Sequence, residues 1–344
     1  MPDEQIRLSV IIPAYNAACD LRECLSAIKH ASPAGVEIIV VDDASTDDTA
    51  AVAGRMGVRV LRLEKNSGPA AARNYGARQA NGEILFFVDA DVVAAPGLLN
   101  RVQSIFDAHP EIAAVFGSYD AFPRADNVVS QFRNLLHHYV HQEGSSDAST
   151  FWAGCGAIRS KAFQASGGFD EKRFTRPSIE DIELGYRLRR AGYRILLDKE
   201  LQGTHLKRWT LWSVIQTDIQ RRAVPWATLM LESKNLLNDL NVKTAQRVSG
   251  ALVTLTCVLI LLAILRPELL ALAGLTSLTV IFLNKDLYRF FFRQRGTLFA
   301  AACIPLHFLY FLYSTLSYLF VWMSFHVQGA VIHRRLLDHR SFYD

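Results

Sequence analysis

Short apolar runs, each followed directly by polar residues, recur through the first half of the chain and predict buried strands. The clearest run is Ile84-Leu-Phe-Phe-Val88, which is followed by two carboxylates, Asp89 and Asp91. Five consecutive apolar residues are typical of a central parallel strand that is buried on both faces. Three further runs share the pattern, at residues 7–13, 35–41 and 58–63.

Helices are predicted between these strands. Residues 20–29 carry apolar residues at the spacing of one helix face, and a Gly68-Pro69 turn leads into a helix of small residues. A cluster of Ser, Thr and Asp at residues 45–49 can cap a helix that begins near Asp47. This alternation predicts a doubly wound α/β sheet that binds a ligand along the carboxyl ends of its strands.

The chain changes character after this region. Residues 151–160 predict a strand that starts with an aromatic pair, and Gly154 and Gly156 within it indicate close approach of a ligand or of backbone. Residues 178–192 predict a helix, and residues 193–197 predict a further strand.

Long apolar runs after residue 247 predict a membrane region. The run at residues 248–265 has bilayer-spanning length, the run at 269–283 is short for it, and the run at 298–327 is more than long enough. Three such runs in succession favour three membrane spans over buried core helices. A bend around Pro305 would let the last run turn back.

Residues 206–247 join the two regions. They carry Trp209, Trp212 and Trp226 among basic residues, which is typical of amphipathic helices in a membrane interface. Pro225 predicts a break between two such helices, and a soluble amphipathic pair is the alternative.

The domain organisation follows from these boundaries. We expect a globular domain at residues 1–205, with halves at about 1–92 and 93–205, interfacial helices at 206–247, a transmembrane region at 248–327 and a polar basic tail at 328–344.

Charge and cysteine content narrow the function classes. The net charge of +4 is mild and does not suggest a nucleic-acid partner, whereas basic residues beside the apolar runs suit an anionic membrane surface. The five cysteines show no paired spacing, which argues for a reducing compartment without disulfides or a zinc site. The acidic N-terminus leads directly into a strand, so we expect no signal peptide.

The carboxylates that follow the strands are the candidate chemical groups. The glycines form no dinucleotide or P-loop pattern, so nucleotide binding would use acids and a metal. Asp43 can accept from a base or ribose, Asp89 from a ribose hydroxyl, and Asp91 can hold a metal on a diphosphate. Arg73 can add charge towards phosphate or base. The alternatives are helix capping for Asp43 and an ordinary turn for Asp89 and Asp91.

Two further acids, Glu180 and Asp181, lie at the start of a predicted helix. Carboxylates are favoured at a helix N-terminus for electrostatic reasons alone. A carboxylate opposite a metal-bound diphosphate is also what a general base needs in order to deprotonate an attacking hydroxyl. His205, near a strand end among polar residues, is either structural or completes a metal shell.

Five of these stretches together resemble glycosyltransferase family 2, in its inverting form with a GT-A catalytic domain. They are Pro13-Ala-Tyr15-Asn16, Val40-Val-Asp-Asp43-Ala-Ser-Thr-Asp47, Asn66-x-Gly68-Pro-x-x-Ala72-Arg73-Asn74, Phe87-Val-Asp89-Ala-Asp91 and Glu180-Asp181-x-Glu183-Leu. Each is weak alone, but the five in this order over roughly residues 6–210 are specific.

The resemblance implies a GT-A type doubly wound mixed sheet, a UDP- or GDP-sugar donor, and Mg²⁺ or Mn²⁺. Asp181 would be the general base, with Glu180 beside it. The implied donor contacts are Pro13, Tyr15, Asp43, Arg73 and Asp89, the implied metal contacts are Asp91 and His205, and the acceptor-side candidates are Trp152, Gly154 and Cys155.

The same resemblance also indicates which chemical class of acceptor the enzyme uses. Enzymes that transfer to polyprenyl phosphate usually lack the Glu-Asp pair, since a phosphate needs no deprotonation, so Glu180-Asp181 favours a hydroxyl acceptor. The membrane region suggests a lipid-linked acceptor or a glycan on a lipid carrier. Processive synthases carry Gln-x-x-Arg-Trp, which residues 220–226 match only partly.

We therefore expect a membrane-bound enzyme of the hexosyltransferase class. The alternatives are a polyprenyl-phosphate glycosyltransferase and a non-catalytic, membrane-anchored protein that binds nucleotide sugars. Lys285, Arg289, Arg293 and Arg295 favour a multi-pass protein of the inner membrane with the catalytic domain on the cytoplasmic side. After three single spans, the basic tail around His333-Arg334-Arg335 would lie outside, against this rule.

Overall fold

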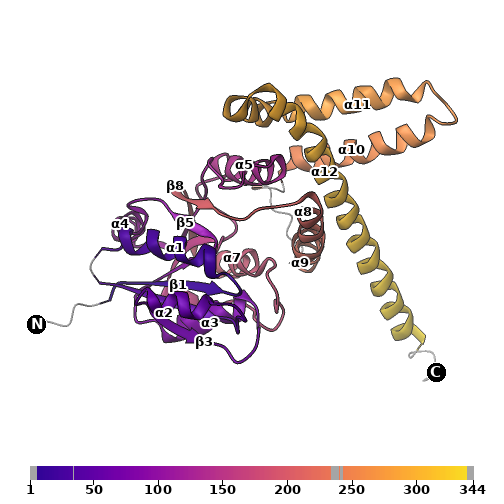
Figure 1. The fold of residues 1–344 in the computed structure, drawn as a ribbon. Helices are drawn as coiled ribbons and strands as arrows, with labels where there is room; N and C mark the ends of the chain where they lie inside the picture. Colours follow the sequence, from indigo (N-terminus) through magenta and orange to yellow (C-terminus); the bar gives the residue numbers. More distant parts are fainter. Residues whose placement is uncertain (1–5, 34, 234–239, 241–242, 339–344) are drawn as a thin grey trace, which may run out of the picture. The chain divides into compact units, whose positions relative to one another are not determined.

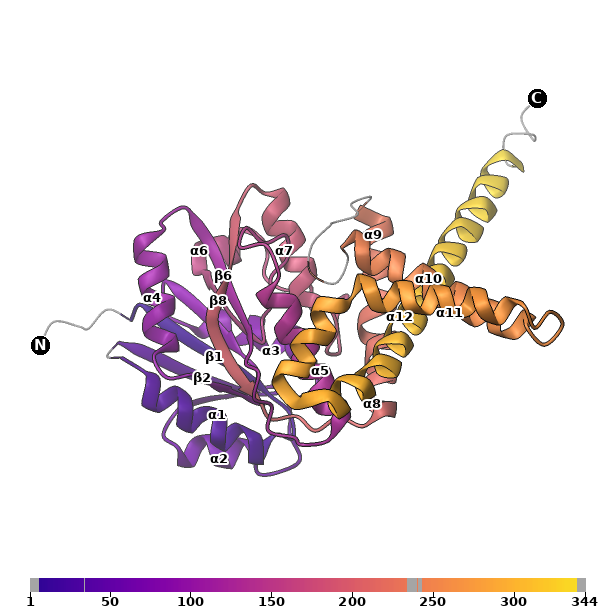
Figure 2. The ribbon, with the colours of Figure 1, turned by 90° about the horizontal axis from the view of Figure 1, so that it is seen from above.

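A computed structural model describes residues 6–33, 35–233, 240 and 243–338, excepting the side chains of residues 328–338. The chain divides into an N-terminal unit (residues 1–210 and 239–241) and a C-terminal unit (residues 211–238 and 242–344). Figures 1 and 2 trace the elements of each unit.

The N-terminal unit is built around one eight-stranded sheet with the strand order β3-β2-β1-β4-β7-β6-β8-β5. The strands are β1 (Leu8–Ala14), β2 (Val36–Asp42), β3 (Arg59–Arg62), β4 (Ile84–Val88), β5 (Val92–Ala94), β6 (Ile112–Tyr119), β7 (Cys155–Arg159) and β8 (Arg194–His205). The pairs β3–β2, β2–β1 and β1–β4 are parallel, and an antiparallel β7 joins β4 to β6. The predicted doubly wound mixed sheet is confirmed.

Seven helices of this unit cross between the described strands. They are α1 (Ala18–Ala31), α2 (Thr49–Arg55), α3 (Pro69–Gln79), α4 (Leu98–Ala108), α5 (Val128–Gln142), α6 (Ser160–Ala165) and α7 (Glu180–Arg190). Residues 98–142, for which we predicted no element, form α4, β6 and α5. The strand predicted at 193–197 is longer than expected, because β8 continues to His205 and pairs there with β5.

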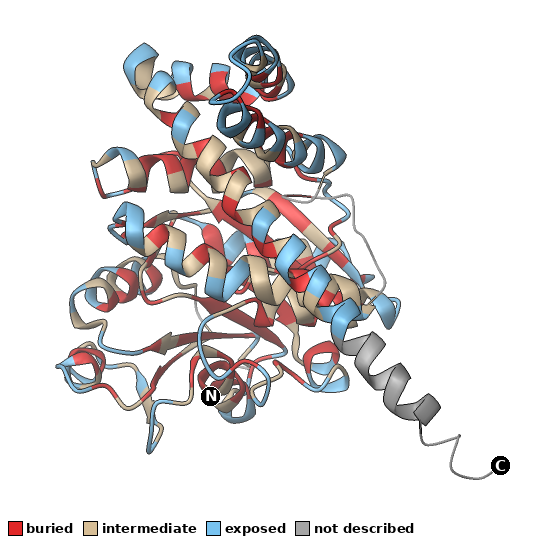
Figure 3. Cartoon of the chain, turned by 90° about the vertical axis from the view of Figure 1, so that its right-hand side faces the viewer, coloured by how far each residue is buried: buried red, intermediate tan, exposed pale blue. Residues whose placement is uncertain are grey.

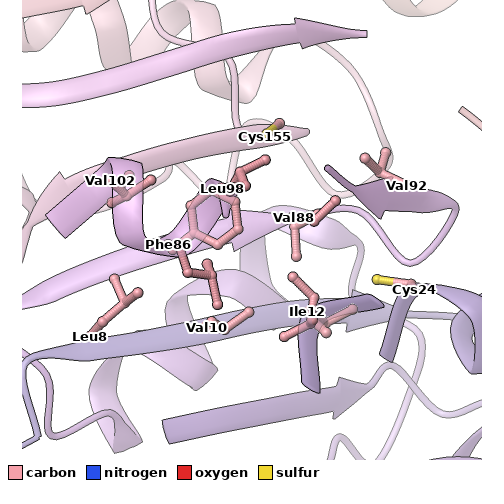
Figure 4. Close-up of a cluster of buried hydrophobic side chains, with 14 of the residues drawn as sticks. Leu8, Val10, Ile12, Cys24, Phe86, Val88, Val92, Leu98, Val102 and Cys155 are labelled. Carbon is pink, nitrogen blue, oxygen red and sulfur yellow. The ribbon is translucent and has the colours of Figure 1, made fainter. Parts of the chain in front are cut away.

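The core lies on both faces of the central strands, which Figure 3 shows mostly as buried segments. Even-numbered residues of β1 and β4 pack with α1 and α4 in one apolar cluster (Figure 4). The odd-numbered Phe87 faces the other side, where its ring centroid lies 5.4 Å from Phe163 and 5.2 Å from Phe169. Because both faces are covered, these strands are apolar at successive positions.

The described secondary structure of the C-terminal unit consists of helices. It contains α8 (Leu211–Asp218), the π-helix η1 (Ile219–Ala223), α9 (Val224–Ser233), α10 (Thr244–Leu262), α11 (Leu269–Leu283) and α12 (Lys285–Asp338). Helices α10 and α11 lie side by side as a hairpin (Figures 1 and 2). By length and composition, α10 and residues 285–327 of α12 can cross a membrane, whereas α11, with 15 residues, is shorter.

The break expected at Pro225 was wrong, and the bend considered around Pro305 lies at another residue. Pro225 does not separate two helices: α8, η1 and α9 follow one another directly, and Pro225 is the second residue of α9. Proline is tolerated in a first helical turn, and the wider π-turn before it accommodates the ring. The interruption of α12 lies at Gly296, with φ of 81°, while Pro305 stays inside the helix. Glycine adopts positive φ without a Cβ clash.

The tryptophans that we predicted to lie in a membrane interface differ in their exposure. Trp209 is 6% exposed in the N-terminal unit, where its backbone N–H donates to Ser130 Oγ at 2.7 Å. Trp212, by contrast, is 72% exposed. The last residues of the predicted tail, 339–344, lie outside the described residues, as do the side chains of His333, Arg334 and Arg335.

Candidate active site

The loops that follow β1 and β2 form one hydrogen-bonded edge of the site. Asn16 and Ala44 have positive φ values of 49° and 59°, so the chain turns sharply after each strand. The Asn16 N–H donates to Ser45 Oγ at 2.9 Å, and Asn16 Oδ1 accepts from the Thr46 N–H at 2.8 Å. These residues belong to two of the motifs; we had assigned Asn16 no role, and Ser45 and Thr46 only a role in helix capping. Their turn-forming types were the available signal.

Asp43 is buried directly after β2, and both of its oxygens are engaged. They accept from the N–H groups of Ser67 at 2.7 Å and Gly68 at 2.8 Å, which positions the loop before α3. Asp43 does not cap α2, where Asp47 Oδ1 accepts from the Thr49 N–H; it binds the N–H of Gly68, the N-cap residue of α3. Tyr15, at the end of β1, is 48% exposed beside this loop system, and Pro13 is the penultimate residue of β1.

Asp89 and Asp91 lie on a turn between β4 and β5, and not on one strand face. The Asp89 N–H donates to Gly154 O at 3.3 Å, and the Val92 N–H donates to Asp89 O at 3.0 Å. Because β5 pairs with β8 at Val92 and His205, the turn brings Asp91 to the end of β8.

The carboxylate of Asp91 and the imidazole of His205 converge there. Asp91 Oδ2 lies 3.5 Å from His205 Nε2, and the His205 ring stacks on Tyr119 with a centroid distance of 4.2 Å. Burial opposes ionisation of Asp91, but His205 and Lys207 outweigh it and hold the pKa of Asp91 below its usual range. Asp91 is therefore a carboxylate at neutral pH.

This pair fits a divalent cation that also binds substrate phosphates. The described residues contain no cluster of three or more His, Cys, Asp or Glu side chains that could hold a metal by themselves. Mg²⁺ is commonly held by one or two protein ligands together with phosphate oxygens and water, and one carboxylate with one imidazole is such a partial shell.

Arg73, on α3, links the Asp89 turn to α7. Its Nη2 donates to Asp89 Oδ1 at 2.6 Å, and its Nη1 donates to Glu180 Oε1 at 2.8 Å. Burial would lower the pKa of Arg73, but the two carboxylates raise it above its usual value. Burial raises the pKa of Asp89, which Arg73 opposes and Asp91 reinforces.

Asp181 is half-buried in the first turn of α7. Its Oδ2 accepts from the Ala153 N–H at 3.0 Å, and its Oδ1 accepts from the Ile182 N–H at 2.8 Å. Burial and the neighbouring Glu180 raise the pKa of Asp181 to about 6, although the Ala153 N–H and Arg73 favour its ionised form. A carboxylate with a raised pKa inside a site is suited to accept a proton.

The acceptor-side candidates have different surroundings. The Trp152 ring is partly buried against Tyr119, at a centroid distance of 4.8 Å. The two glycines make room for this segment itself: a Cβ on Gly154 would lie 2.5 Å from the Trp152 ring, and one on Gly156 would lie 2.3 Å from Trp152 O. Cys155 is buried in the core, and burial raises the pKa of its thiol.

Part of the chain matches a known protein family. Residues 9–167 match the model of glycosyl transferase family 2. The chain is 31% identical over 201 residues to a pre-mycofactocin glycosyltransferase of Mycobacterium tuberculosis, covering 55% of this chain and 40% of that protein. It is 31% identical over 235 residues to a validoxylamine A glucosyltransferase of Streptomyces hygroscopicus, covering 57% and 54%. The matched region thus spans about half the length of these relatives or less.

Among solved structures, a mannosyltransferase from Pyrobaculum calidifontis in complex with GDP-Man and Mn²⁺ has a TM-score of 0.54. The two chains are 20% identical, and the likeness covers 93% of this chain and 89% of that one. It concerns the fold, a GT-A type mixed sheet followed by helices, as the sequence predicted. The part of the chain that carries Asp43, Arg73, Asp89 and Asp91 therefore matches glycosyl transferase family 2.

Proposed function

We propose that this chain is a membrane-anchored, metal-dependent, inverting glycosyltransferase. It transfers a sugar from a UDP- or GDP-sugar to a hydroxyl of a lipid-linked or glycan acceptor. The observation that carries this proposal is that residues Ala153 and Gly154 connect the donor-side turn with the base. The Asp89 N–H donates to Gly154 O, and the neighbouring Ala153 N–H donates to Asp181 Oδ2.

The donor roles follow from position around the sheet edge. Asp91 and His205 would hold Mg²⁺ or Mn²⁺, and the cation would supply positive charge beside the diphosphate of the donor. Asp89 takes a ribose hydroxyl. Asp43 contacts the base of the nucleotide, together with Pro13 and Tyr15 at the end of β1.

The transfer step uses Asp181 as the general base. Its carboxylate takes the proton of the acceptor hydroxyl while the hydroxyl oxygen bonds to the anomeric carbon. The bond from that carbon to the diphosphate breaks, and the nucleoside diphosphate leaves with the electron pair. Attack from the face opposite the leaving group inverts the anomeric configuration. Trp152, Gly154 and the backbone of Cys155 lie on the acceptor side of Asp181.

Membrane attachment is supported by α10 and by the apolar part of α12. The basic residues of α12 before Gly296 favour an inner-membrane, multi-pass arrangement with the N-terminal unit on the cytoplasmic side. Lipids would then cover the apolar helices, and a lipid-linked acceptor would lie in the same membrane.

The proposal is tested by screening UDP- and GDP-sugars, with Mn²⁺ and with EDTA. The readouts are thermal stabilisation of the chain and release of the nucleoside diphosphate. We expect one donor class to stabilise the chain only with metal, because a bound ligand shifts stability by mass action. Asp91→Ala should abolish this stabilisation and lower turnover roughly 100-fold or more.

The matched control is Asp107→Asn, which removes an exposed carboxylate that pairs with Arg7. It should leave both readouts unchanged. Full metal-dependent turnover in Asp91→Ala would refute the site assignment. Donor binding without release, in the presence of candidate acceptors, would favour the non-catalytic alternative.

A further inference from the structure

Arg73 joins the two acidic motifs of the site in one buried bridge. Its Nη1 donates to Glu180 Oε1 at 2.8 Å and its Nη2 donates to Asp89 Oδ1 at 2.6 Å. Asp89 follows β4, whereas Glu180 opens α7. The guanidinium thus connects the donor side of the sheet with the helix that carries Asp181.

Little of the Arg73 side chain is left for a donor. It is 5% exposed, and its Cζ lies 5.5 Å from the ring centroid of Phe169. The planar guanidinium is suited to satisfying two carboxylates at once. A phosphate that took the place of Asp89 or Glu180 would leave that carboxylate without its cation.

The next residue of α3 forms a second clamp on the same region. Asn74 Nδ2 donates to Phe169 O at 2.8 Å, and Asn74 Oδ1 accepts from the Phe169 N–H at 2.9 Å. The same Nδ2 also donates to Glu171 Oε2 at 2.8 Å. Two consecutive side chains of α3 therefore hold the turn before α7 and the first residue of α7.

The placement of Asp181 depends on this support. The N-cap of α7 is Ile179, whose apolar side chain cannot accept a hydrogen bond. Glu180 instead fixes the chain just before the helix, because its Oε2 accepts from the Ser178 N–H at 2.8 Å. Its other oxygen is the one bound by Arg73, so the Arg73–Glu180 bond orients the turn that presents Asp181.

We propose that Arg73 is a positioning residue that acts through Glu180 and Asp89. Through these two carboxylates it keeps Asp181 at a fixed position relative to the turn that carries Asp89. This inference rests on the proposed function and deepens it. It differs from the donor contact that the family resemblance implies for Arg73. A direct donor contact and a bridge predict different kinetics.

A double-mutant cycle with Arg73→Gln and Glu180→Gln distinguishes the two roles. Release of UDP from UDP-glucose and of GDP from GDP-mannose is measured with Mn²⁺ on the full chain. We expect each single variant to lower kcat roughly 10- to 100-fold, because a small displacement of a reacting group has effects of this size. The donor KM should stay within about threefold, and the double variant should be no worse than the poorer single variant.

Two outcomes would overturn the proposal. One is a double variant whose loss is the product of the single losses, because the two residues would then act independently. The other is an Arg73→Gln variant with a raised donor KM and an unchanged kcat, as a donor ligand would show. Wild-type chain that releases no nucleoside diphosphate from any UDP- or GDP-sugar with Mn²⁺ would refute the proposed function itself, and this inference with it.

Folding is monitored by thermal melting of every variant. The matched control is Arg101→Gln, which breaks a partly buried bridge from α4 to Asp198 (Nη2 to Oδ1, 2.8 Å) away from the acids of the site. It should lower stability without changing kcat. If Arg73→Gln does not fold, Glu180→Gln alone remains decisive, because it leaves Arg73 paired with Asp89. An unchanged kcat in that variant would refute the bridge.

Discussion

Two adjacent acids at the start of α7 have different surroundings and therefore different chemistry. Both oxygens of Glu180 are engaged, by the Arg73 guanidinium and by the Ser178 N–H. Asp181 is more exposed, accepts from two backbone N–H groups, and has a pKa of about 6. Since a general base must be ionised and still bind a proton well, Asp181 is the better candidate of the two.

This difference predicts the pH dependence of turnover. Asp181 can take a proton only when ionised, and the ionised fraction falls as pH drops through its pKa of about 6. We therefore expect kcat for the wild-type chain to be constant above this value and to fall tenfold per pH unit well below it. A pH profile of nucleoside diphosphate release that stays flat through this range would contradict the prediction.

Asp181→Asn tests the same residue by substitution. We expect it to lower transfer to a hydroxyl acceptor by roughly 100-fold or more and to remove the acidic limb of the profile. The control Asp170→Asn changes a nearby turn carboxylate that accepts from the Arg173 N–H, and it should keep the limb. Nearly full activity of Asp181→Asn would instead support a phosphate acceptor, which needs no deprotonation.

At the scale of elements, the distance between α3 and the sheet decides where Arg73 and Asn74 reach. A Cβ on Gly76 would lie 2.6 Å from Ile11 Cγ2 and 3.0 Å from Val41 Cγ2. The helix therefore packs against β1 and β2 at a separation that only glycine permits.

Gly76→Ala should consequently destabilise the chain by about 1–3 kcal/mol, because the added methyl group forces α3 or the sheet to shift. The measurement is the melting temperature, and release of the nucleoside diphosphate is the functional readout. The matched control is Gly54→Ala in α2, where a Cβ would have nothing within 4 Å, so stability should hold or rise. Equal stability of Gly76→Ala and wild type would show that the packing is looser than described.

At the scale of the whole molecule, the two units expose different surfaces. The N-terminal unit buries its large apolar side chains around the sheet. Helices of the C-terminal unit expose theirs, including Leu261 at 67%, Leu278 at 65% and Phe320 at 61%. A soluble monomer rarely exposes apolar side chains over such continuous helices, so lipid is the expected surrounding of α10 and α12.

The full chain should accordingly sediment with membranes, resist washing with high salt and alkaline carbonate, and be released by detergent. The wash separates insertion from surface attraction, because salt screens charges but does not weaken apolar burial. Recovery of the chain in the supernatant after a salt wash would contradict membrane insertion and leave only peripheral attachment.

The sequence determined the elements and motifs whose signal is local. Apolar runs located β1, β2 and β4, and the residues after them placed Asp43, Asp89 and Asp91 at one edge of the sheet. Hydropathy also separated the helical C-terminal unit. These features are readable because burial on both faces, turn chemistry and membrane-length helices each leave a continuous pattern in the chain.

Only the tertiary structure decided which side chains meet. The extension of β8 to His205 and its pairing with Val92 put an imidazole beside Asp91. The meeting of Arg73 with Glu180 joins residues 107 positions apart. The interruption of α12 at Gly296, and not at Pro305, depends on the backbone angles of one residue. Such contacts depend on the packing of distant elements, which local hydrophobic patterns do not record, so a motif residue such as Arg73 revealed its partners only in the folded chain.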